Sequence, residues 1–566
     1  MVSMDMSKAL DVIYANRDKF IIIGLTGRTG AGCSFVASVL ASQIREVLSE
    51  KQTVNLNDDN NKRKDNIVKE YIEKNWSPFF VIKVRDIIST FILDHTYDEV
   101  VDFVHNVNNK LDFSPMKEMF EEVKNKRACL NEVLNDKHDD ANANDVYKFL
   151  SRDIGNFTDS VKQYFEGISK DECIRVYQII GDNIRLYGNA IGRGEADGNN
   201  IYAISARINL LVKGLRNYNK QNSGKDYFVI DAFRNPIEVK FFQERFSAFY
   251  LWAINAPDED RKDRLIHNLK MDIDEINRLD AKEYSENDYL KGRAEFVSQN
   301  IGECIQSADV FVRNVGDHTN TNFELLYQQI LKYISLIKHP GIVTPSRDER
   351  CMQVAGTAKL NSGCISRQVG AAIADEFGFV RAIGWNDAPR GQTPCLLKSC
   401  YDLMKNHDDR SYSKYEKTCK KFKEIVKDYY DKLKAITGEK GITLCYCFKD
   451  IQNEIDGKGN QVHTRSLHAE ENAFLSLING SGSCVRGGTL YTTSSPCVLC
   501  AKKAYQLGVK RVVYVDRYPD ISFDHIFAGG SEPPVPELYS GALGAAFYKL
   551  YQPIVPLKDE LNALSC

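Results

Sequence analysis

Apolar residues in the first 340 positions fall into short runs separated by polar, helix-length stretches. Such runs, bounded by turn residues, are typical of strands that alternate with helices. The expected strands are the runs at 20–24, 79–88, 227–233, 248–256 and 308–316, where the second run continues into a helix. A helical stretch at 236–246 separates two of them, which predicts parallel βαβ units. The segment from about 90 to 200 has a mostly helical pattern.

A second set of alternating elements follows the segment HPGIVTP at 339–345, where proline and glycine interrupt a helix. Its expected strands lie at 369–374, 379–384, 488–493 and 511–516, and its expected helices at 347–361, 469–479 and 498–507. A long, highly charged helical insertion occupies about 400–436. We therefore expect two α/β domains, at 1–338 and 345–566. The length of 566 residues also favours more than one domain.

Composition and charge argue against several classes of protein. The longest apolar runs, at 20–25 and 249–256, are far shorter than the roughly 20 residues of a membrane-spanning helix, so no membrane span is expected. The first 20 residues do not follow the pattern of a signal peptide, which predicts a cytoplasmic protein. Fifteen scattered cysteines favour thiols and metal ligands over disulfides. The net charge of −3 provides no overall attraction for nucleic acid.

Two short segments of the second domain carry metal-binding chemistry. HAEENA at 468–473 and SSPCVLC at 494–500 contain H-x-E and P-C-x-x-C, the signature of zinc nucleobase deaminases. His468, Cys497 and Cys500 would supply three ligands to Zn²⁺, which leaves a fourth position open, as catalytic zinc requires. Glu470 is not needed as a ligand and would carry protons. The alternative is a structural zinc site, for which a fourth nearby protein ligand is missing.

The segment SGCISRQVGAAIADEFGFVRAIGWNDAPRG at 362–391 resembles the first strands of deoxycytidylate deaminases. The resemblance implies that Asn386 contacts the sugar of the substrate; the alternative is that Asn386 is a turn residue beside Pro389. Trp385 and Asp387 depart from the tyrosine and glycine of the family pattern. Some members hold a second, structural zinc near the insertion, where this chain has either such a site or buried thiols at Cys395, Cys400, Cys419, Cys445 and Cys447.

The glycine-rich segment GRTGAGCS at 27–34 fits the spacing of a phosphate-binding P-loop, except that Cys33 occupies the lysine position. Backbone N–H groups of such a loop face a phosphate, and a serine in the last position can reach Mg²⁺. IDAFRNPIEV at 230–239 resembles P-loop nucleotide-kinase-like proteins, as does the segment at 255–265 with Arg261 and Arg264 placed to meet phosphates. The expected nucleotide-binding residues are Gly27, Gly30, Gly32, Cys33, Ser34 and Asp231. Without the lysine, we expect a nucleotide sensor; phosphoryl transfer and a structural relic are the alternatives.

A P-loop kinase-like domain followed by a deaminase domain of the α/β/α type resembles bacterial antiphage deoxycytidine nucleotide deaminases. The resemblance implies conversion of dCTP to dUTP and of dCMP to dUMP, which depletes dCTP during phage replication. It also implies a regulatory nucleotide, an inhibitory small RNA and a homo-oligomer. Two alternatives stay open: a deaminase of RNA or single-stranded DNA bases, and a nucleotide-sensing regulator without catalysis.

Overall fold

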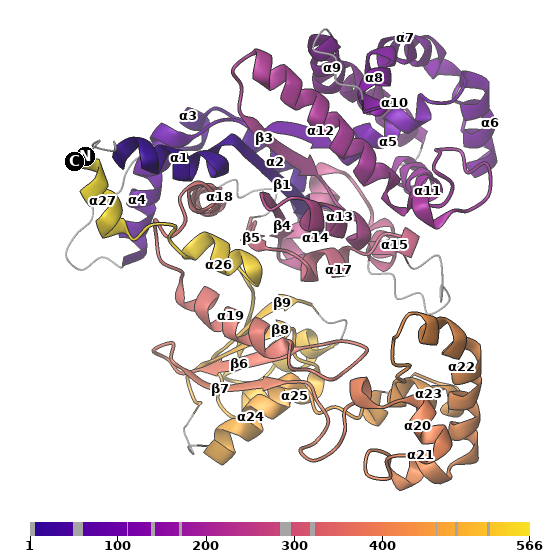
Figure 1. Cartoon of the computed structure of the whole chain (residues 1–566), viewed down its shortest axis with the longest axis vertical. Coiled ribbons are helices and arrows are strands. Elements are labelled where there is room, and N and C mark those ends of the chain that lie inside the picture. Colours follow the sequence, from indigo (N-terminus) through magenta and orange to yellow (C-terminus); the bar gives the residue numbers. More distant parts are fainter. Residues whose placement is uncertain are drawn as a thin grey trace. The chain divides into compact units, whose positions relative to one another are not determined.

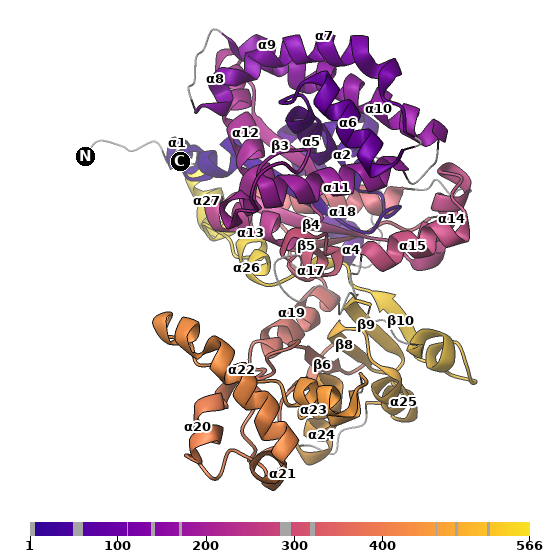
Figure 2. The ribbon, with the colours of Figure 1, turned by 90° about the vertical axis from the view of Figure 1, so that its right-hand side faces the viewer.

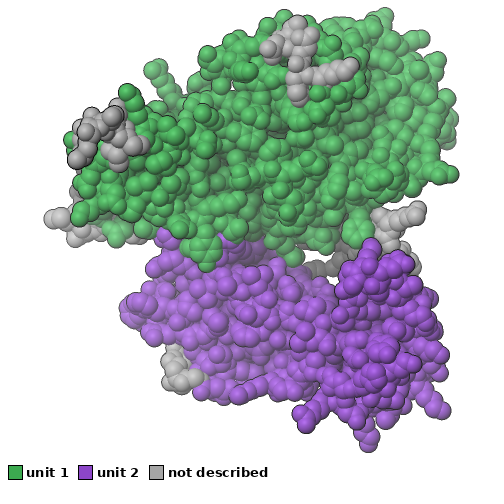
Figure 3. All heavy atoms as spheres, in the orientation of Figure 1, with its two compact units in different colours: residues 1–344, 545–566 green, residues 345–544 purple. Residues whose placement is uncertain are grey.

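The computed structural model describes residues 6–48, 60–109, 111–136, 142–168, 172–283, 296–316, 323–459, 461–480, 485–517 and 521–565. The chain divides into two compact units, coloured separately in Figure 3: unit 1 contains residues 1–344 and 545–566, and unit 2 contains residues 345–544. The chain passes from unit 1 to unit 2 between Thr344 and Pro345, and residues 545–566 group with unit 1. The two domains expected at 1–338 and 345–566 stay a prediction.

Unit 1 is built on a parallel sheet whose strands lie in the order β5-β4-β1-β3-β2 (Figure 1). The strands are β1 (Phe20–Thr26), β2 (Phe80–Lys83), β3 (Asp226–Asp231), β4 (Phe249–Asn255) and β5 (Val310–Arg313). These are the five apolar runs in which strands were expected, and that expectation is confirmed. All seven residues of β4 are buried, because a parallel sheet is covered on both faces.

Helices account for most of the rest of unit 1. The segment between β2 and β3 is helical, as its pattern predicted, and gathers into one cluster in both ribbon views (Figure 1, Figure 2). The helices of this unit are α1 (Met6–Lys19), α2 (Cys33–Ala41), α3 (Ile44–Val47), α4 (Asn60–Asn75), α5 (Val84–Ile92), α6 (Tyr97–Val107), α7 (Lys117–Arg127), α8 (Asn131–Leu134), α9 (Ala143–Lys148), α10 (Ile154–Ile168), α11 (Glu172–Tyr187), α12 (Ala203–Gln221), α13 (Pro236–Arg245), α14 (Asp258–Asn268), α15 (Ile273–Glu283), α17 (Ile301–Gln306), α18 (Glu324–Lys338), α26 (Ala545–Tyr551) and α27 (Leu557–Leu564). No helix among the described residues is long and apolar enough to span a bilayer.

Unit 2 contains a mixed sheet in the order β10-β9-β8-β6-β7, in which β6 runs antiparallel to both β7 and β8. Its strands are β6 (Gly370–Ala374), β7 (Val380–Trp385), β8 (Thr489–Ser494), β9 (Arg511–Asp516) and β10 (Val535–Leu538), followed by the short β11 (Gly541–Ala542). Its helices are α19 (Arg347–Lys359), α20 (Cys400–Lys405), α21 (Lys414–Thr418), α22 (Lys420–Glu439), α23 (Phe448–Asp456), α24 (Ala469–Gly480) and α25 (Val498–Gln506).

Two glycines show that helices cover both faces of this sheet at close range. A Cβ on Gly370 would lie 2.0 Å from the carbonyl oxygen of Ala355 in α19, and a Cβ on Gly384 would lie 2.3 Å from the backbone nitrogen of Ala473 in α24. Gly384 shares its face with Ala371, its cross-strand partner, which lies in the same apolar core as residues of α24 and α25. The sheet is thus the middle layer between α19 and the helix pair α24 and α25.

The charged insertion expected at about 400–436 is helical, as predicted, but longer. It contains four helices, α20 to α23, and extends to Asp456. Asn406 ends α20 in the left-handed conformation, and the extended backbone of Cys419 separates α21 from α22. These breaks allow the helices to fold around an apolar core of their own, which contains Phe422 and Val426.

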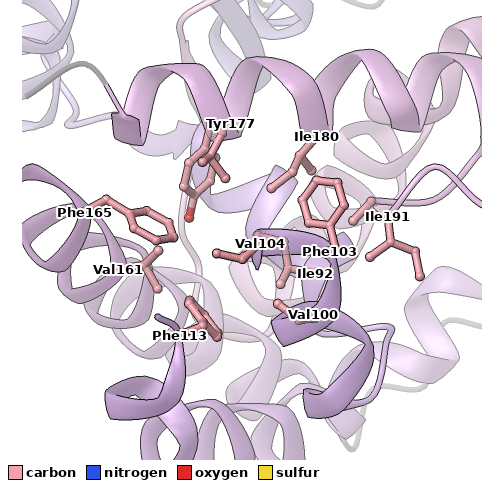
Figure 4. Close-up of a pocket in the computed structure, with 12 residues that line it drawn as sticks. Ile92, Val100, Phe103, Val104, Phe113, Val161, Phe165, Tyr177, Ile180 and Ile191 are labelled. Carbon is pink, nitrogen blue, oxygen red and sulfur yellow. The ribbon is translucent and has the colours of Figure 1, made fainter. Parts of the chain in front are cut away.

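A small apolar cavity lies in the helical cluster of unit 1 (Figure 4). Ile92, Val104, Phe113, Val161, Phe165 and Ile180 are among the residues that line it. We expect Val161→Ile to fill part of this space and to raise the stability of unit 1 by about 1 kcal/mol, measured by urea unfolding. Val12→Ile, at a side chain that is 71% exposed, is the matched control and should change little. A destabilised Val161→Ile would mean that the cavity walls cannot accept one more methylene group.

Candidate metal centre

Three potential metal ligands meet where α24 and α25 begin. His468 directly precedes α24, Cys497 is the N-cap residue of α25, and Cys500 lies one turn further along α25. His468 Nδ1 lies 3.4 Å from Cys497 Sγ and 3.5 Å from Cys500 Sγ. Within the part of the chain that the structure describes, no other three His, Cys, Asp or Glu side chains come together closely enough to hold a metal. The five cysteines in and beside the insertion therefore do not form a second group of this kind.

The geometry of the three ligand atoms fits a zinc ion. Zinc–sulfur bonds of about 2.3 Å and zinc–nitrogen bonds of about 2.1 Å in a tetrahedral site separate ligand atoms by about 3.6 Å. The two measured sulfur–nitrogen separations are close to that value. Hydrogen bonds from Cys500 and His468 lower the pKa of Cys497 to about 3, although burial opposes the shift. Cys497 is therefore a thiolate at neutral pH, which is the form that binds metal.

Glu470 lies next to the three ligands, in the first turn of α24. Its side chain is only 4% exposed, and burial raises its pKa. The Thr492 hydroxyl, from β8, donates a hydrogen bond to Glu470 Oε1 at 3.0 Å. A buried carboxyl group with a raised pKa and a fixed position is suited to accept and return a proton. Thr492 was not singled out from the sequence, although it lies on the strand that leads directly to Cys497.

Asn386 follows β7 and is 8% exposed, and its side chain forms several hydrogen bonds within the protein. Its Oδ1 accepts a hydrogen bond from the Val369 amide at 2.7 Å, and its Nδ2 donates to the Arg367 carbonyl oxygen at 2.8 Å. The Ser362 hydroxyl lies 2.9 Å from the same Oδ1. Asn386 thus joins the end of β7 to the segment before β6, and its Nδ2 has one acceptor among the described residues, although the amide carries two N–H groups.

This arrangement predicts a structural cost for losing the Asn386 side chain. Asn386→Ala should destabilise unit 2 by about 1–3 kcal/mol in chemical denaturation, because the Val369 amide loses its acceptor. Ser362→Ala keeps the bond between Asn386 and Val369 and should cost less. Unchanged stability in Asn386→Ala would show that these hydrogen bonds contribute nothing, and would leave substrate contact as the role of this side chain.

Trp385 and Asp387, which depart from the family pattern, accept hydrogen bonds from α24 and from the segment before His468. The Asp387 carbonyl oxygen accepts a hydrogen bond from the Leu467 amide at 2.9 Å, directly before His468. The Trp385 carbonyl oxygen accepts one from Asn472 Nδ2 in α24 at 2.8 Å. Both contacts involve backbone carbonyl groups, of Trp385 at the end of β7 and of Asp387 two residues later, so the chain position at the metal ligands does not depend on a glycine or tyrosine there.

In unit 1 the glycine-rich segment joins β1 to α2. Gly30 and Gly32 have φ values of +85° and +105°, which favour glycine, and Cys33 is the first residue of α2. Ser34 Oγ donates a hydrogen bond of 2.7 Å to Asp231 Oδ2 at the end of β3. A Cβ on Gly27 would lie 2.6 Å from the carbonyl oxygen of Ile254. The fold therefore brings Ser34 of the loop next to Asp231, which is 197 residues away in the sequence.

The two arginines expected to meet phosphates have other partners. Arg261 is 1% exposed; its guanidinium donates to the Thr29 carbonyl oxygen at 3.2 Å and pairs with Asp280 at 2.6 Å. Arg264 donates to the Asp260 and Asn314 carbonyl oxygens at 3.2 and 3.5 Å. Both side chains hold α14 against the loop and its surroundings.

The segment that carries the three candidate ligands matches a model of a known protein family. Residues 345–516 match the model of the cytidine and deoxycytidylate deaminase zinc-binding region. A deoxycytidylate deaminase of Schizosaccharomyces pombe is 27% identical over 230 residues, which are 40% of this chain and 54% of that protein. One from Enterobacteria phage T2 is 28% identical over 167 residues, 30% of this chain and 78% of that protein.

Among solved structures, this chain is similar to the dCMP deaminase of cyanophage S-TIM5 in complex with dCMP and dUMP. The match has 22% sequence identity and a TM-score of 0.22, and it covers 35% of this chain and 99% of the phage protein. The chain spans about half the length of the S. pombe relative. The C-terminal part of this chain therefore contains a deoxycytidylate deaminase-like region at residues 345–516.

Proposed function

We propose that unit 2 catalyses the hydrolytic deamination of deoxycytidine nucleotides, dCMP to dUMP and dCTP to dUTP. The observation that carries the proposal is the convergence of His468, Cys497 and Cys500 beside the buried carboxyl group of Glu470. The relatives of S. pombe and phage T2 are deoxycytidylate deaminases, which supports a deoxycytidylate substrate. His468, Cys497 and Cys500 would hold Zn²⁺, which supplies a Lewis acid that lowers the pKa of water in the site.

Glu470 carries the proton in the proposed reaction. Its carboxylate takes a proton from the attacking water and passes it to N3 of the cytosine ring, while the water oxygen bonds to C4 and the C4–N3 double bond becomes single. Glu470 then moves the second water proton from the new hydroxyl group to the amino nitrogen, the bond from C4 to this nitrogen breaks as C4=O forms, and ammonia leaves, so that cytosine and water give uracil and ammonia. The hydrogen bond from Thr492 holds the carboxyl group in place during both transfers. Asn386 is proposed to contact the sugar of the substrate.

Unit 1 is proposed to be a P-loop kinase-like domain that senses a nucleotide. The hydrogen bond between Ser34 and Asp231 supports this proposal, because these two oxygen ligands could share Mg²⁺ with phosphate oxygens. Because the whole chain resembles bacterial antiphage deoxycytidine nucleotide deaminases, we further propose that the protein is a cytoplasmic homo-oligomer that depletes dCTP in antiviral defence. We also propose that a small RNA inhibits it.

The test is a product assay with the full-length protein. dCMP, dCTP, CTP, cytidine and short single-stranded DNA or RNA are incubated separately with zinc-loaded protein, and uracil-containing products are quantified by chromatography. We expect product from dCMP, dCTP or both, loss of activity when a chelator removes the metal, and recovery when zinc is added. Product from the polynucleotides alone would overturn the proposal in favour of base editing. If zinc-loaded protein is inactive on every substrate, with and without added ATP, the protein is a regulator without catalysis.

A further inference from the structure

A carboxylate of the protein already occupies the glycine-rich loop of unit 1. The Thr29 amide, in the middle of the loop, lies 3.1 and 3.2 Å from the two carboxylate oxygens of Glu283 and donates a hydrogen bond to them. The Thr29 hydroxyl donates to the same carboxylate. Glu283 is the last residue of α15, and its side chain has no exposed surface. An N–H group that a P-loop offers to a phosphate is therefore bound to an internal anion.

Arg234 brings a positive charge to the same place. Its guanidinium donates to Glu283 Oε1 at 2.7 Å and to Thr29 Oγ1 at 3.0 Å. It also lies close enough to Cys33 and Asp231 to interact with both electrostatically. Cys33 occupies the position at which a P-loop has its lysine, so the cation that the loop sequence lacks comes from the segment after β3. Arginine binds phosphate through a planar, bidentate group.

Three other arginines lie at the loop and bind oxygen atoms of the protein. Arg28 pairs with Asp258 at 2.5 Å and with Asp280 at 2.7 Å. Arg261 pairs with Asp280 and binds the Thr29 carbonyl oxygen. Arg264 binds the carbonyl oxygens of Asp260 and Asn314. Arg234 binds the same carboxylate as the Thr29 amide, so a phosphate in the place of this carboxylate would meet it.

Space for a ligand lies directly beside the loop. A hollow of about 480 Å³ is lined by Ser34 and Asp231, by Lys83 at the end of β2, and by the small side chains of Ala37, Ser38 and Ala41 on one face of α2. Its volume lies in the range of small-molecule pockets, roughly 300–1,000 Å³. Ser34, the last residue of the glycine-rich segment, lines the hollow and is hydrogen-bonded to Asp231, so the hollow adjoins the loop.

We propose that this region binds the phosphates of a nucleoside polyphosphate, that Arg234 replaces the missing P-loop lysine, and that Glu283 is an internal anion that the phosphate displaces. The inference rests on the nucleotide binding proposed above and specifies how that site is controlled. With a competing internal carboxylate, the apparent affinity is the intrinsic affinity multiplied by the fraction of time that the loop is free of the carboxylate. The site would therefore respond to abundant nucleotides, and binding would release the end of α15 from the loop.

The experiment is isothermal titration of the full-length protein with ATP and, separately, with inorganic tripolyphosphate. Glu283→Gln keeps the size and hydrogen-bonding capacity of the side chain but removes its charge, and it should tighten the binding of both probes about tenfold or more. Arg234→Gln should weaken binding by a similar factor, and Arg234→Lys should recover part of it. Asp274→Asn removes the same charge from an exposed position on α15 and should bind as the unaltered protein does.

The outcomes separate this inference from the nucleotide binding on which it rests. Equal affinity of ATP for the unaltered protein, Glu283→Gln and Arg234→Gln would overturn the roles of Glu283 and Arg234 and leave nucleotide binding intact. Binding of ATP without any binding of tripolyphosphate would also contradict a phosphate site at the loop. Absence of binding of either probe at millimolar concentration, in the unaltered protein and in Glu283→Gln alike, would refute both proposals. Thermal unfolding of each variant shows that the compared proteins are folded.

Discussion

Glu470→Gln should reduce the rate of dCMP deamination by about three orders of magnitude and leave the zinc content unchanged. Glutamine keeps the size of the side chain and can still hydrogen-bond to the Thr492 hydroxyl, which lies 3.0 Å from Glu470 Oε1. It can neither accept the protons of the attacking water nor pass them to the cytosine ring and the leaving amino group. Because the loss affects a proton transfer in the reaction and not the uptake of substrate, we expect kcat to fall far more than KM rises.

The matched control is Glu471→Gln, one residue further along α24. Glu471 forms an ion pair with Lys503 of α25, away from the proposed proton transfer, so this variant should remain active and bind zinc. Metal analysis of the purified proteins distinguishes the two roles that a carboxylate can have beside these ligands. Loss of zinc together with activity in Glu470→Gln would mean that Glu470 holds the metal, and an active Glu470→Gln would mean that another group carries the proton.

Local sequence was sufficient to predict the parts of the structure that depend on neighbouring residues. The strands of unit 1 are apolar runs because both faces of a parallel sheet are buried, as the seven buried residues of β4 illustrate. Cys497 and Cys500 are three residues apart, so one turn of α25 places both beside the same metal position. The roles of Glu470, Asn386 and the loop residues stay predictions, which the variants described above test.

The remaining features depend on contacts between distant segments, which leave no local pattern. Glu283 meets Thr29 across 254 residues, and nothing in the acidic, helical sequence of α15 distinguishes it from an exposed carboxylate. The helical character of the charged insertion was predicted, but the amphipathic pattern does not show the left-handed turn at Asn406 that ends α20. Residues 545–566 group with unit 1 although the chain returns to it only after all of unit 2.

Glu416 in the insertion is the residue whose loss should destabilise unit 2 most. It is fully buried in α21, and its carboxylate accepts hydrogen bonds from Lys398 Nζ at 3.0 Å and from the Tyr446 hydroxyl at 2.7 Å. Arg465, three residues before His468, pairs with it at 2.7 Å. Glu416→Gln leaves two buried cations without their anion, so we expect a loss of about 3–5 kcal/mol in chemical denaturation. Asp431→Asn, at an exposed pair with Lys434 on α22, is the control and should change little.

The same contacts predict how the stability depends on pH. Burial alone would raise the pKa of Glu416, but hydrogen bonds from Tyr446 and Ser413 and the charges of Lys398 and Arg465 outweigh it and lower the pKa to about 2. Because the pKa in the unfolded chain is about 4.3, the contribution of Glu416 is fully present above that pH and declines as the pH falls towards 2. Unfolding free energies of the unaltered protein and Glu416→Gln should therefore converge between about pH 4 and pH 2. A constant difference across this range would show that the charge of Glu416 is not what stabilises the insertion, and that glutamine fails for reasons of packing.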